Sequence, residues 1–125
     1  MNGRQNIGKR GEEEACMYLV QHGHSILDRN WRSSHLELDI VSLAGDGVHF
    51  VEVKSRTAPV LAEPEINVNA AKRNRMVRAA GAWLSTEAAG KVGDAESFFD
   101  VITVVFDGSD TRIEYLPKAF IPIYV

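Results

Sequence analysis

Two runs of alternating apolar and polar residues, 36–43 and 48–54, lie on either side of a glycine-rich turn at 44–47. Alternation with a period of two is typical of β-strands, and glycine permits the positive φ that a tight reversal often needs. We therefore expect a β-hairpin. In its first strand one face should carry Leu36, Leu38 and Ile40 and the other Glu37 and Asp39. In its second strand one face should carry Phe50, Glu52 and Lys54 and the other Val51 and Val53.

Helical periodicity is found on both sides of this hairpin. Apolar residues at three- and four-residue steps predict a helix over about 6–22, with Gly23 as its C-terminal cap. A longer helix should begin after Asn67 or Asn69 and run to about residue 89, with Gly90 behind it. Its predicted apolar stripe consists of Val77, Ala80, Gly81, Leu84 and Ala88, and a second stripe consists of Lys72, Arg75 and Ala79.

Three further strands complete the order of elements. Residues 25–31 precede the hairpin, residues 97–106 form an apolar central strand, and residues 112–116 form a short edge strand that Pro117 stops. The resulting order is helix, three strands, helix and two strands. It predicts an α/β fold with a mixed β-sheet flanked by helices, in which the first three strands form an antiparallel meander and the long helix crosses over.

Length and composition narrow the class of protein. A chain of 125 residues fits a single domain, 1–125, and 45% hydrophobic residues can supply its core. One cysteine, Cys16, excludes an intramolecular disulfide and reads as a small core residue. Because no apolar run reaches the roughly 20 residues of a membrane span and the N-terminus lacks a signal-peptide core, we expect a cytoplasmic protein that does not enter a membrane.

Charge is distributed unevenly along the chain. The net charge of -3 argues against nonspecific coating of nucleic acid. However, residues 36–52 carry four acidic and no basic side chains, whereas residues 53–80 carry six basic and two acidic ones. This pattern is compatible with a carboxylate site beside a phosphate-facing surface, and equally with a solvated mosaic of charges.

Asp39, Glu52 and Lys54 form the arrangement that suggests chemistry. The hairpin brings the two carboxylates together, and Lys54 shares the face of Glu52. A divalent cation such as Mg²⁺ would relieve the carboxylate repulsion, and the lysine could handle a proton or stabilise charge at phosphorus. The alternative is an ordinary exposed hairpin with facing charges. Glu12 either faces inward on the first helix or lies at its edge, where it would favour the positive N-terminal end.

Many short motifs in the same order resemble the bacterial UPF0102, or YraN-like, family across nearly the whole chain. The motifs are Gly8-x-x-Gly11-Glu12, Tyr18-Leu19, Gly23, Ile26-Leu27, Asn30-Trp31-Arg32, Glu37-x-Asp39-Ile40-Val41, Phe50-Val51-Glu52-Val53-Lys54-x-Arg56, Lys72, Ala79, Trp83-Leu84, Asp100-Val101 and Ala119-Phe120. That family in turn resembles the PD-(D/E)XK nucleases, closest to archaeal Holliday junction resolvases. The resemblance therefore implies a restriction-endonuclease-like core.

The resemblance also implies roles for individual residues. Asp39, Glu52 and Glu12 would bind Mg²⁺ or Mn²⁺, and Lys54 would be the catalytic lysine. Two positions depart from the pattern. Leu38 stands where the superfamily name has proline, and Phe98 stands where many relatives have arginine, which removes a phosphate contact expected from that strand.

Several other side chains are secondary candidates. Lys72, Arg75 and Arg56 are candidates for contact with DNA phosphates, although Lys72 and Arg75 also fit a solvated helix face. Glu37 is either a further acid of the site or the partner of an arginine. Trp31 and Trp83 could stack on bases, but core packing is favoured for both. The four histidines, at 22, 24, 35 and 49, show no recognised metal-ligand spacing.

Two functions from different classes follow. The first is a metal-dependent endonuclease acting on DNA, including branched or structured DNA. The second is a noncatalytic nucleic-acid-binding or scaffold module that retains a nuclease fold. The apolar tail at 120–125 would suit docking or a homodimer.

Overall fold

The computed structural model describes residues 3–60 and 69–121. Its elements, in chain order, are α1 (Gly3–Gln21), β1 (Ser25–Ser33), β2 (Leu36–Ala44), β3 (Gly47–Thr57), α2 (Ala70–Leu84), the short 3-10 helix η1 (Glu87–Lys91), β4 (Ser97–Asp107) and β5 (Asp110–Phe120). The predicted order of elements is confirmed. No helix in the described ranges is long and apolar enough to cross a membrane.

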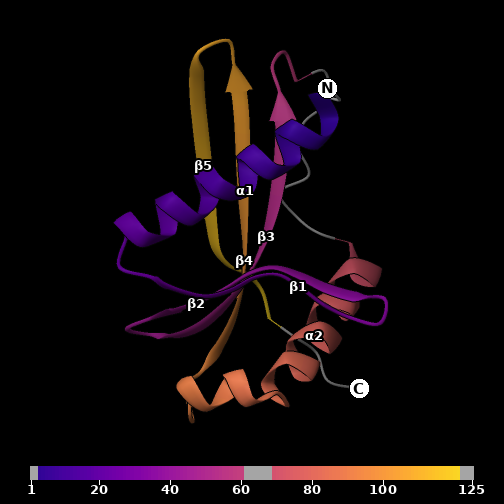
Figure 1. Ribbon diagram of the computed structural model, residues 1–125, viewed down its shortest axis with the longest axis vertical. Helices are drawn as coiled ribbons and strands as arrows, with labels where there is room; N and C mark the ends of the chain where they lie inside the picture. The colour runs from indigo at the N-terminus through magenta and orange to yellow at the C-terminus, as the bar shows by residue number, and fades with distance from the viewer. Residues whose placement is uncertain (1–2, 61–68, 122–125) are drawn as a thin grey trace.

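The five strands form one mixed sheet in the order β1-β2-β3-β4-β5. β1, β2 and β3 pair antiparallel as a meander, β3 and β4 pair parallel, and β4 and β5 pair antiparallel. α2 lies in the crossover between the two parallel strands, as predicted. Figure 1 shows α1 crossing in front of β3, β4 and β5, while the β1–β2 ribbon runs across the direction of these strands.

Each face of the sheet packs against one helix. On the α1 side the fully buried apolar residues include Ala15, Leu19, Ile40, Val51 and Ile102, together with the predicted core cysteine, Cys16. On the α2 side they include Val41, Phe50, Ala79, Trp83 and Phe99. Because neighbouring residues such as Ile40 and Val41 belong to different clusters, the two clusters lie on opposite faces. The two-layer core therefore holds β2 and β3 between the helices.

Strand β3 keeps the predicted alternation, but β2 does not. Leu38 packs in the α2-side cluster and Ile40 in the α1-side cluster, although the two residues are only two positions apart. The prediction that they share a face is therefore wrong. The register between β2 and β3 runs from Ala44–Gly47 to Ile40–Val51, so β2 changes its orientation just where this pairing ends. Asp39 lies at that point.

Helix α2 ends earlier than its periodicity predicts, at Leu84 rather than near residue 89. The hydroxyl of Thr86 donates to the carbonyl of Trp83 at 2.6 Å, and that of Ser85 donates to the carbonyl of Gly81 at 3.1 Å. These side chains satisfy the last carbonyls and favour termination, so Gly90 is not the cap. The capping residue at the start is Asn69, whose side chain accepts the Lys72 N–H.

The buried stripe of α2 also differs from the predicted one. Its buried residues are Met76, Ala79, Ala80 and Trp83, whereas Leu84 is exposed. The large side chains of Met76 and Trp83 fill more of the space above the sheet than the residues of the predicted stripe would. Ala79, which was predicted to lie on a second stripe with Lys72 and Arg75, is one of the residues that face the sheet.

Strand β5 is longer than expected, because Pro117 does not stop it. The register shifts between Phe99 and Val101, so that residues 117–119 of β5 lie opposite Asp100 alone. A bulge of this kind on an edge strand tolerates a proline, which lacks the N–H of a regular ladder. The Asp100 carboxylate accepts the Lys118 N–H at 2.9 Å and so replaces the interrupted pairing. Most of the apolar tail, 122–125, lies outside the described residues.

Candidate functional site

Asp39 marks the place where β2 separates from β3. Its Oδ2 accepts the backbone N–H of Val53 at 2.8 Å, so a side chain bonds the neighbouring strand beyond the last paired residues. Val53 directly follows Glu52, which places the Asp39 carboxyl beside that residue. The predicted juxtaposition of the two acids across the hairpin is therefore present, through a local break in the ladder rather than through regular pairing.

Glu52 lies on the α2 face of β3, the face that it was predicted to share with Phe50. Its Oε1 contacts the ammonium of Lys72 from α2. A hollow of about 110 Å³ adjoins this ion pair between the start of β2 and α2. Its lining residues are His35, Leu36, Glu37, Glu52, Lys72, Arg75 and Met76. Two of the three predicted DNA-contacting residues, Lys72 and Arg75, thus lie beside a predicted metal ligand.

Glu12 lies within α1, more than two turns after Gly3, and is 8% exposed. The inward-facing alternative is correct, and the helix-terminus alternative is wrong. Its Oε1 lies 3.6 Å from Nε of Arg29 and has no hydrogen-bond partner among the residues that the structure describes, although the atom is buried. A buried carboxylate oxygen in this state is costly, which indicates a site kept for a reason other than stability.

The position of Glu12 depends on a close approach of α1 to β3 at Gly11. A Cβ at Gly11 would lie 1.8 Å from Oγ of Ser55, so only glycine permits this distance. No described atom lies within 4 Å of a corresponding Cβ at Gly8, one turn earlier. Contact at Gly11 therefore fixes the height of the adjacent Glu12 above the sheet.

The Asp39 carboxyl feels the charges of both other acids. Burial and then the negative charge of Glu52 raise the pKa of Asp39 to about 7, with a smaller contribution from Glu12. The Val53 N–H and the charge of Lys72 act in the opposite direction. Burial also raises the pKa of Glu12, against the attraction of Arg29. The site thus concentrates negative charge in a place from which water is largely excluded.

Carboxylate oxygens are suitable ligands for Mg²⁺ or Mn²⁺, and Oε1 of Glu12, which has an ion pair but no hydrogen bond among the described residues, fits such a role. As the side chains stand, however, no group of three acidic, histidine or cysteine side chains within 3–60 and 69–121 is arranged to hold a metal ion. Cationic side chains instead accompany two of the acids, Lys72 at Glu52 and Arg29 at Glu12. The donor set fits a divalent cation, and binding would require these cations to move.

Lys54 lies two residues beyond Glu52 on β3 and is partly buried. It pairs in register with Thr103 of the parallel strand β4, at the centre of the sheet. Residues two apart on a strand share a face, so Lys54 is placed on the same side as Glu52. This rigid central position is suitable for a group that must be oriented accurately toward a substrate.

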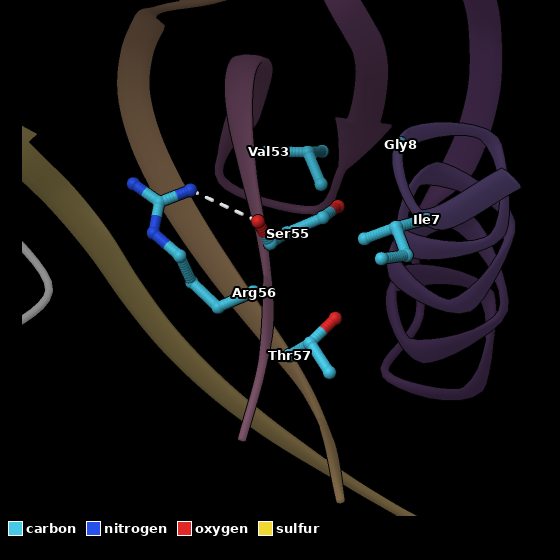
Figure 2. A pocket seen from close by; sticks show the side chains of 6 residues that line it. All are labelled: Ile7, Gly8, Val53, Ser55, Arg56 and Thr57. Atoms are coloured by element: carbon cyan, nitrogen blue, oxygen red, sulfur yellow. Dashed lines mark hydrogen bonds between the residues drawn. The ribbon is translucent and has the colours of Figure 1, made fainter. Parts of the chain in front are cut away.

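Arg56 continues the same face of β3. Figure 2 shows its side chain directed away from those of Val53, Ser55 and Thr57, which point toward α1 and Ile7. Its guanidinium donates to the carbonyl of Ser55 at 2.9 Å, and the residue is exposed. Arg56 also lines an open pocket of about 430 Å³, together with Ile7, Gly8 and the residues of β3 that point toward α1, Val53, Ser55 and Thr57. Arg56 is thus accessible on the face that carries Glu52.

The remaining candidates divide between the site and the core. Glu37 pairs with Arg32 at 3.5 Å and is well exposed, which favours the arginine-partner alternative, yet it also lines the hollow beside Glu52. Trp83 is fully buried and donates from Nε1 to Asp28 at 3.1 Å. Trp31 packs against the same cluster. Core packing of both tryptophans is therefore confirmed.

A second polar cluster, away from the three acids, escaped the sequence analysis. The fully buried Asp100 accepts hydrogen bonds at 2.5 Å from both Nδ1 of His49 and the hydroxyl of Tyr115. Nε2 of His49 donates to Asp46 at 2.8 Å. Burial disfavours the charged ring, but the bonds to Asp100 and Asp46 outweigh it and raise the pKa of His49. Two features of the sequence could have indicated this cluster: a histidine, His49, on the same strand face as Val51, and an aspartate, Asp100, within the otherwise apolar strand β4.

The mixed sheet with a helix on each face, together with acids gathered where two of its strands separate, is consistent with the restriction-endonuclease-like class of α/β fold. The family described as "Uncharacterised protein family UPF0102" matches residues 11–104. A UPF0102 protein of Nitratidesulfovibrio vulgaris strain DP4 is 41% identical over 120 residues, covering 96% of this chain and 87% of the relative. One of Bacteroides thetaiotaomicron is 39% identical and covers 98% of both chains. The chain belongs to the UPF0102 family.

Proposed function

We propose that this chain is a metal-dependent endonuclease that hydrolyses phosphodiester bonds in DNA, including branched or structured DNA. The observation that carries the proposal is the position of the Asp39 carboxyl where β2 separates from β3: it bonds the Val53 N–H, directly after Glu52, and Glu12 of α1 is near enough to act on its charge. Lys54 follows Glu52 by two residues on the same strand. Like charges brought together in a buried place lower the stability of a fold, so such an arrangement points to function.

The proposed roles follow from the positions of the side chains. Asp39, Glu52 and Glu12 would hold Mg²⁺ or Mn²⁺, which when bound supplies a Lewis acid for water and phosphate. Lys54 would take up or deliver a proton at Nζ, or stabilise the negative charge that develops on the phosphate. Arg56, Lys72 and Arg75 would orient the DNA through its phosphates.

Cleavage assays test this proposal directly. Labelled duplex, flap, single-stranded and four-way-junction DNA are incubated with the protein in Mg²⁺, Mn²⁺ or chelator. We expect cleavage with a metal, none with chelator and none for Asp39→Asn. The preferred DNA structure then identifies the substrate class.

A noncatalytic DNA-binding module is the second candidate. The observation that favours it is the neutralisation of Glu52 by Lys72 and of Glu12 by Arg29, with no ready-made metal-binding group in the described ranges. DNA binding without cleavage of any of the four substrates, in either metal, would support this candidate over the nuclease.

A further inference from the structure

Lys72 occupies a special place on α2. The helix buries Met76, Ala79, Ala80 and Trp83, and Lys72 lies one turn before Met76 on the same stripe. The Asn69 cap binds the backbone N–H of Lys72 at 2.9 Å and so fixes the start of the helix. Lys72 therefore extends the core-facing stripe of α2 toward the acids, and its ammonium reaches Glu52 on the sheet while part of the side chain stays exposed.

The ammonium of Lys72 is the counter-ion of a proposed metal ligand. It contacts Oε1 of Glu52, whose side chain is 14% exposed, while the lysine side chain is 39% exposed. Its charge also acts on Asp39. The single positive charge of Lys72 thus neutralises the acids that would bind a divalent cation, so Lys72 and the metal would compete for them. The exposed part of the lysine gives it a route away from Glu52.

The hollow next to the ion pair offers a second position for this ammonium. It is lined by both Lys72 and Arg75, which lie within one turn of α2, and by His35 from the loop before β2. Glu37 and Glu52 line the same hollow, so its two cations are balanced while Glu52 is free of metal. Once a divalent cation neutralises Glu52, the two cationic side chains favour an anion, and a backbone phosphate of DNA is the anion that the proposed function brings there. Lys72 can therefore serve either a carboxylate or a phosphate.

We propose that the Lys72 ammonium and the divalent cation exchange at Glu52, so that metal binding releases Lys72 to a DNA phosphate. This inference rests on the proposed function. Two cations cannot both lie against one carboxylate oxygen without strong mutual repulsion, so the lysine and the metal compete. The exchange makes Lys72 a positioning residue that couples two ligands. By linkage, metal strengthens DNA binding, and DNA, by drawing Lys72 away, strengthens metal binding by the same factor.

Calorimetric titration of Mn²⁺ into the DNA-free protein tests the competition. We compare the wild type with Lys72→Met and with Arg78→Met, which removes the same charge from an exposed position of the same helix. Loss of the competing ion pair should tighten Mn²⁺ binding roughly fivefold to tenfold in Lys72→Met. Arg78→Met should change it by less than about twofold, because an exposed distant charge is screened by solvent and salt.

The outcomes separate this inference from the proposed function. If the wild type binds Mn²⁺ and Lys72→Met binds it no more tightly than Arg78→Met does, the exchange is wrong while the metal site stands. If neither the wild type nor Lys72→Met binds Mn²⁺, the metal site itself is wrong and the exchange falls with it. Binding by Lys72→Met but not by the wild type would support the exchange strongly.

DNA binding supplies the second readout. Fluorescence anisotropy with labelled DNA is measured with and without Mn²⁺, with all proteins carrying Lys54→Ala to prevent turnover. In the Lys54→Ala parent, Mn²⁺ should strengthen DNA binding, and adding Lys72→Met should remove most of that increase. Adding Arg78→Met instead should lower the affinity for DNA by no more than the contribution of one phosphate contact, and the increase in affinity on adding Mn²⁺ should remain. A full response to Mn²⁺ without Lys72 would contradict the exchange.

Discussion

Lys54 is the residue on which catalysis should depend. Lys54→Ala should retain metal and DNA binding but lose cleavage by about a hundredfold or more, the usual effect of removing one positioned proton-transfer or charge-stabilising group. Lys54→Arg should not restore activity, because arginine remains charged and its planar group is too large for the place beside Glu52. Single-turnover cleavage rates at saturating protein measure both variants. An active Lys54→Ala variant would reject this mechanism even if the protein proved to be a nuclease.

Asp39 should lower the stability of the metal-free protein. Asp39→Asn keeps an acceptor for the Val53 N–H but removes a buried charge beside Glu52 and Glu12. We expect the free energy of unfolding at pH 8 to rise by on the order of 1–3 kcal/mol, and the stabilisation by added Mn²⁺ to disappear. Urea unfolding with and without Mn²⁺ measures both effects.

Glu37→Gln is the matched control for this substitution, because Glu37 precedes Asp39 by two residues on β2 and its side chain is 63% exposed. Its effect should stay within about 0.5 kcal/mol. A loss of stability in Asp39→Asn comparable to that of a core substitution would show that the carboxylate is a structural acceptor rather than a strained ligand.

The acids of the candidate site can be predicted from the sequence, but the cations that pair with them cannot. The spacing of Asp39 and Glu52 is a local property of one hairpin, so its turn length was enough to predict that they lie side by side, although β2 leaves the regular ladder just before Asp39. The pairing of Glu12 with Arg29 and of Glu52 with Lys72 depends on how each helix is placed on the sheet. That placement is set by packing between distant segments, which a one-dimensional pattern does not contain.

At the scale of elements, the contact of α1 with β3 depends on one glycine. Gly11→Ala would place a methyl group 1.8 Å from Oγ and 2.9 Å from Cβ of Ser55, so the helix must shift. We expect a loss of about 1–3 kcal/mol in the free energy of unfolding, as for other overpacked contacts. Because the shift also displaces Glu12, Mn²⁺ affinity should fall. Thermal unfolding and calorimetry measure the two effects.

Gly8→Ala provides the matched control within the same helix, since no atom of the described residues lies within 4 Å of its Cβ position. Here the higher helix propensity of alanine should stabilise the protein by up to about 1 kcal/mol. Equal effects of the two substitutions would mean that helix propensity, rather than contact with Ser55, governs both positions.

The ends of α2 and β5 show where periodicity loses its predictive value. The stripe of α2 was assigned from small apolar residues, but Met76 and Trp83 bury more surface and determine which face meets the sheet. Pro117 normally ends a strand, yet the buried Asp100 accepts the Lys118 N–H and lets β5 continue through a bulge. Both corrections arise from tertiary contacts that outweigh a correct local preference.

At the scale of the whole molecule, the cluster around His49 joins four parts of the chain. Asp46 lies in the β2–β3 turn, His49 in β3, Asp100 in β4 and Tyr115 in β5. Both ring nitrogens of His49 lie at hydrogen-bond distance from carboxylates, an arrangement that favours the protonated ring, which can donate to both. Removing one partner of such a buried pair costs about 3–5 kcal/mol, and Asp100→Asn should therefore destabilise the entire sheet. Urea unfolding at pH 6 measures this loss.

The same cluster should make stability depend on pH. The raised pKa of His49 means that the folded state keeps its proton at pH values where the unfolded chain, with a histidine pKa of about 6.5, has released it. The stabilisation is complete below about pH 6.5 and is lost as pH rises through the folded-state pKa, with a slope of at most about 1.4 kcal/mol per pH unit. The pKa of Asp39, raised to about 7, makes stability fall as the pH rises from about 4 to about 7. Above pH 7 this contribution is nearly constant, so the effect of His49 is measured there.

Asp46→Asn keeps an acceptor for Nε2 but removes one of the two charges that raise the pKa of His49. The folded-state pKa of His49 should therefore fall in this variant, and the pH range over which stability declines should become narrower. NMR titration of the His49 ring protons gives the pKa, and urea unfolding between pH 6 and 10 gives the stability. A wild-type His49 that titrates at or below the ordinary histidine value would contradict the doubly bonded imidazolium, since two carboxylates at hydrogen-bond distance can only favour the charged ring.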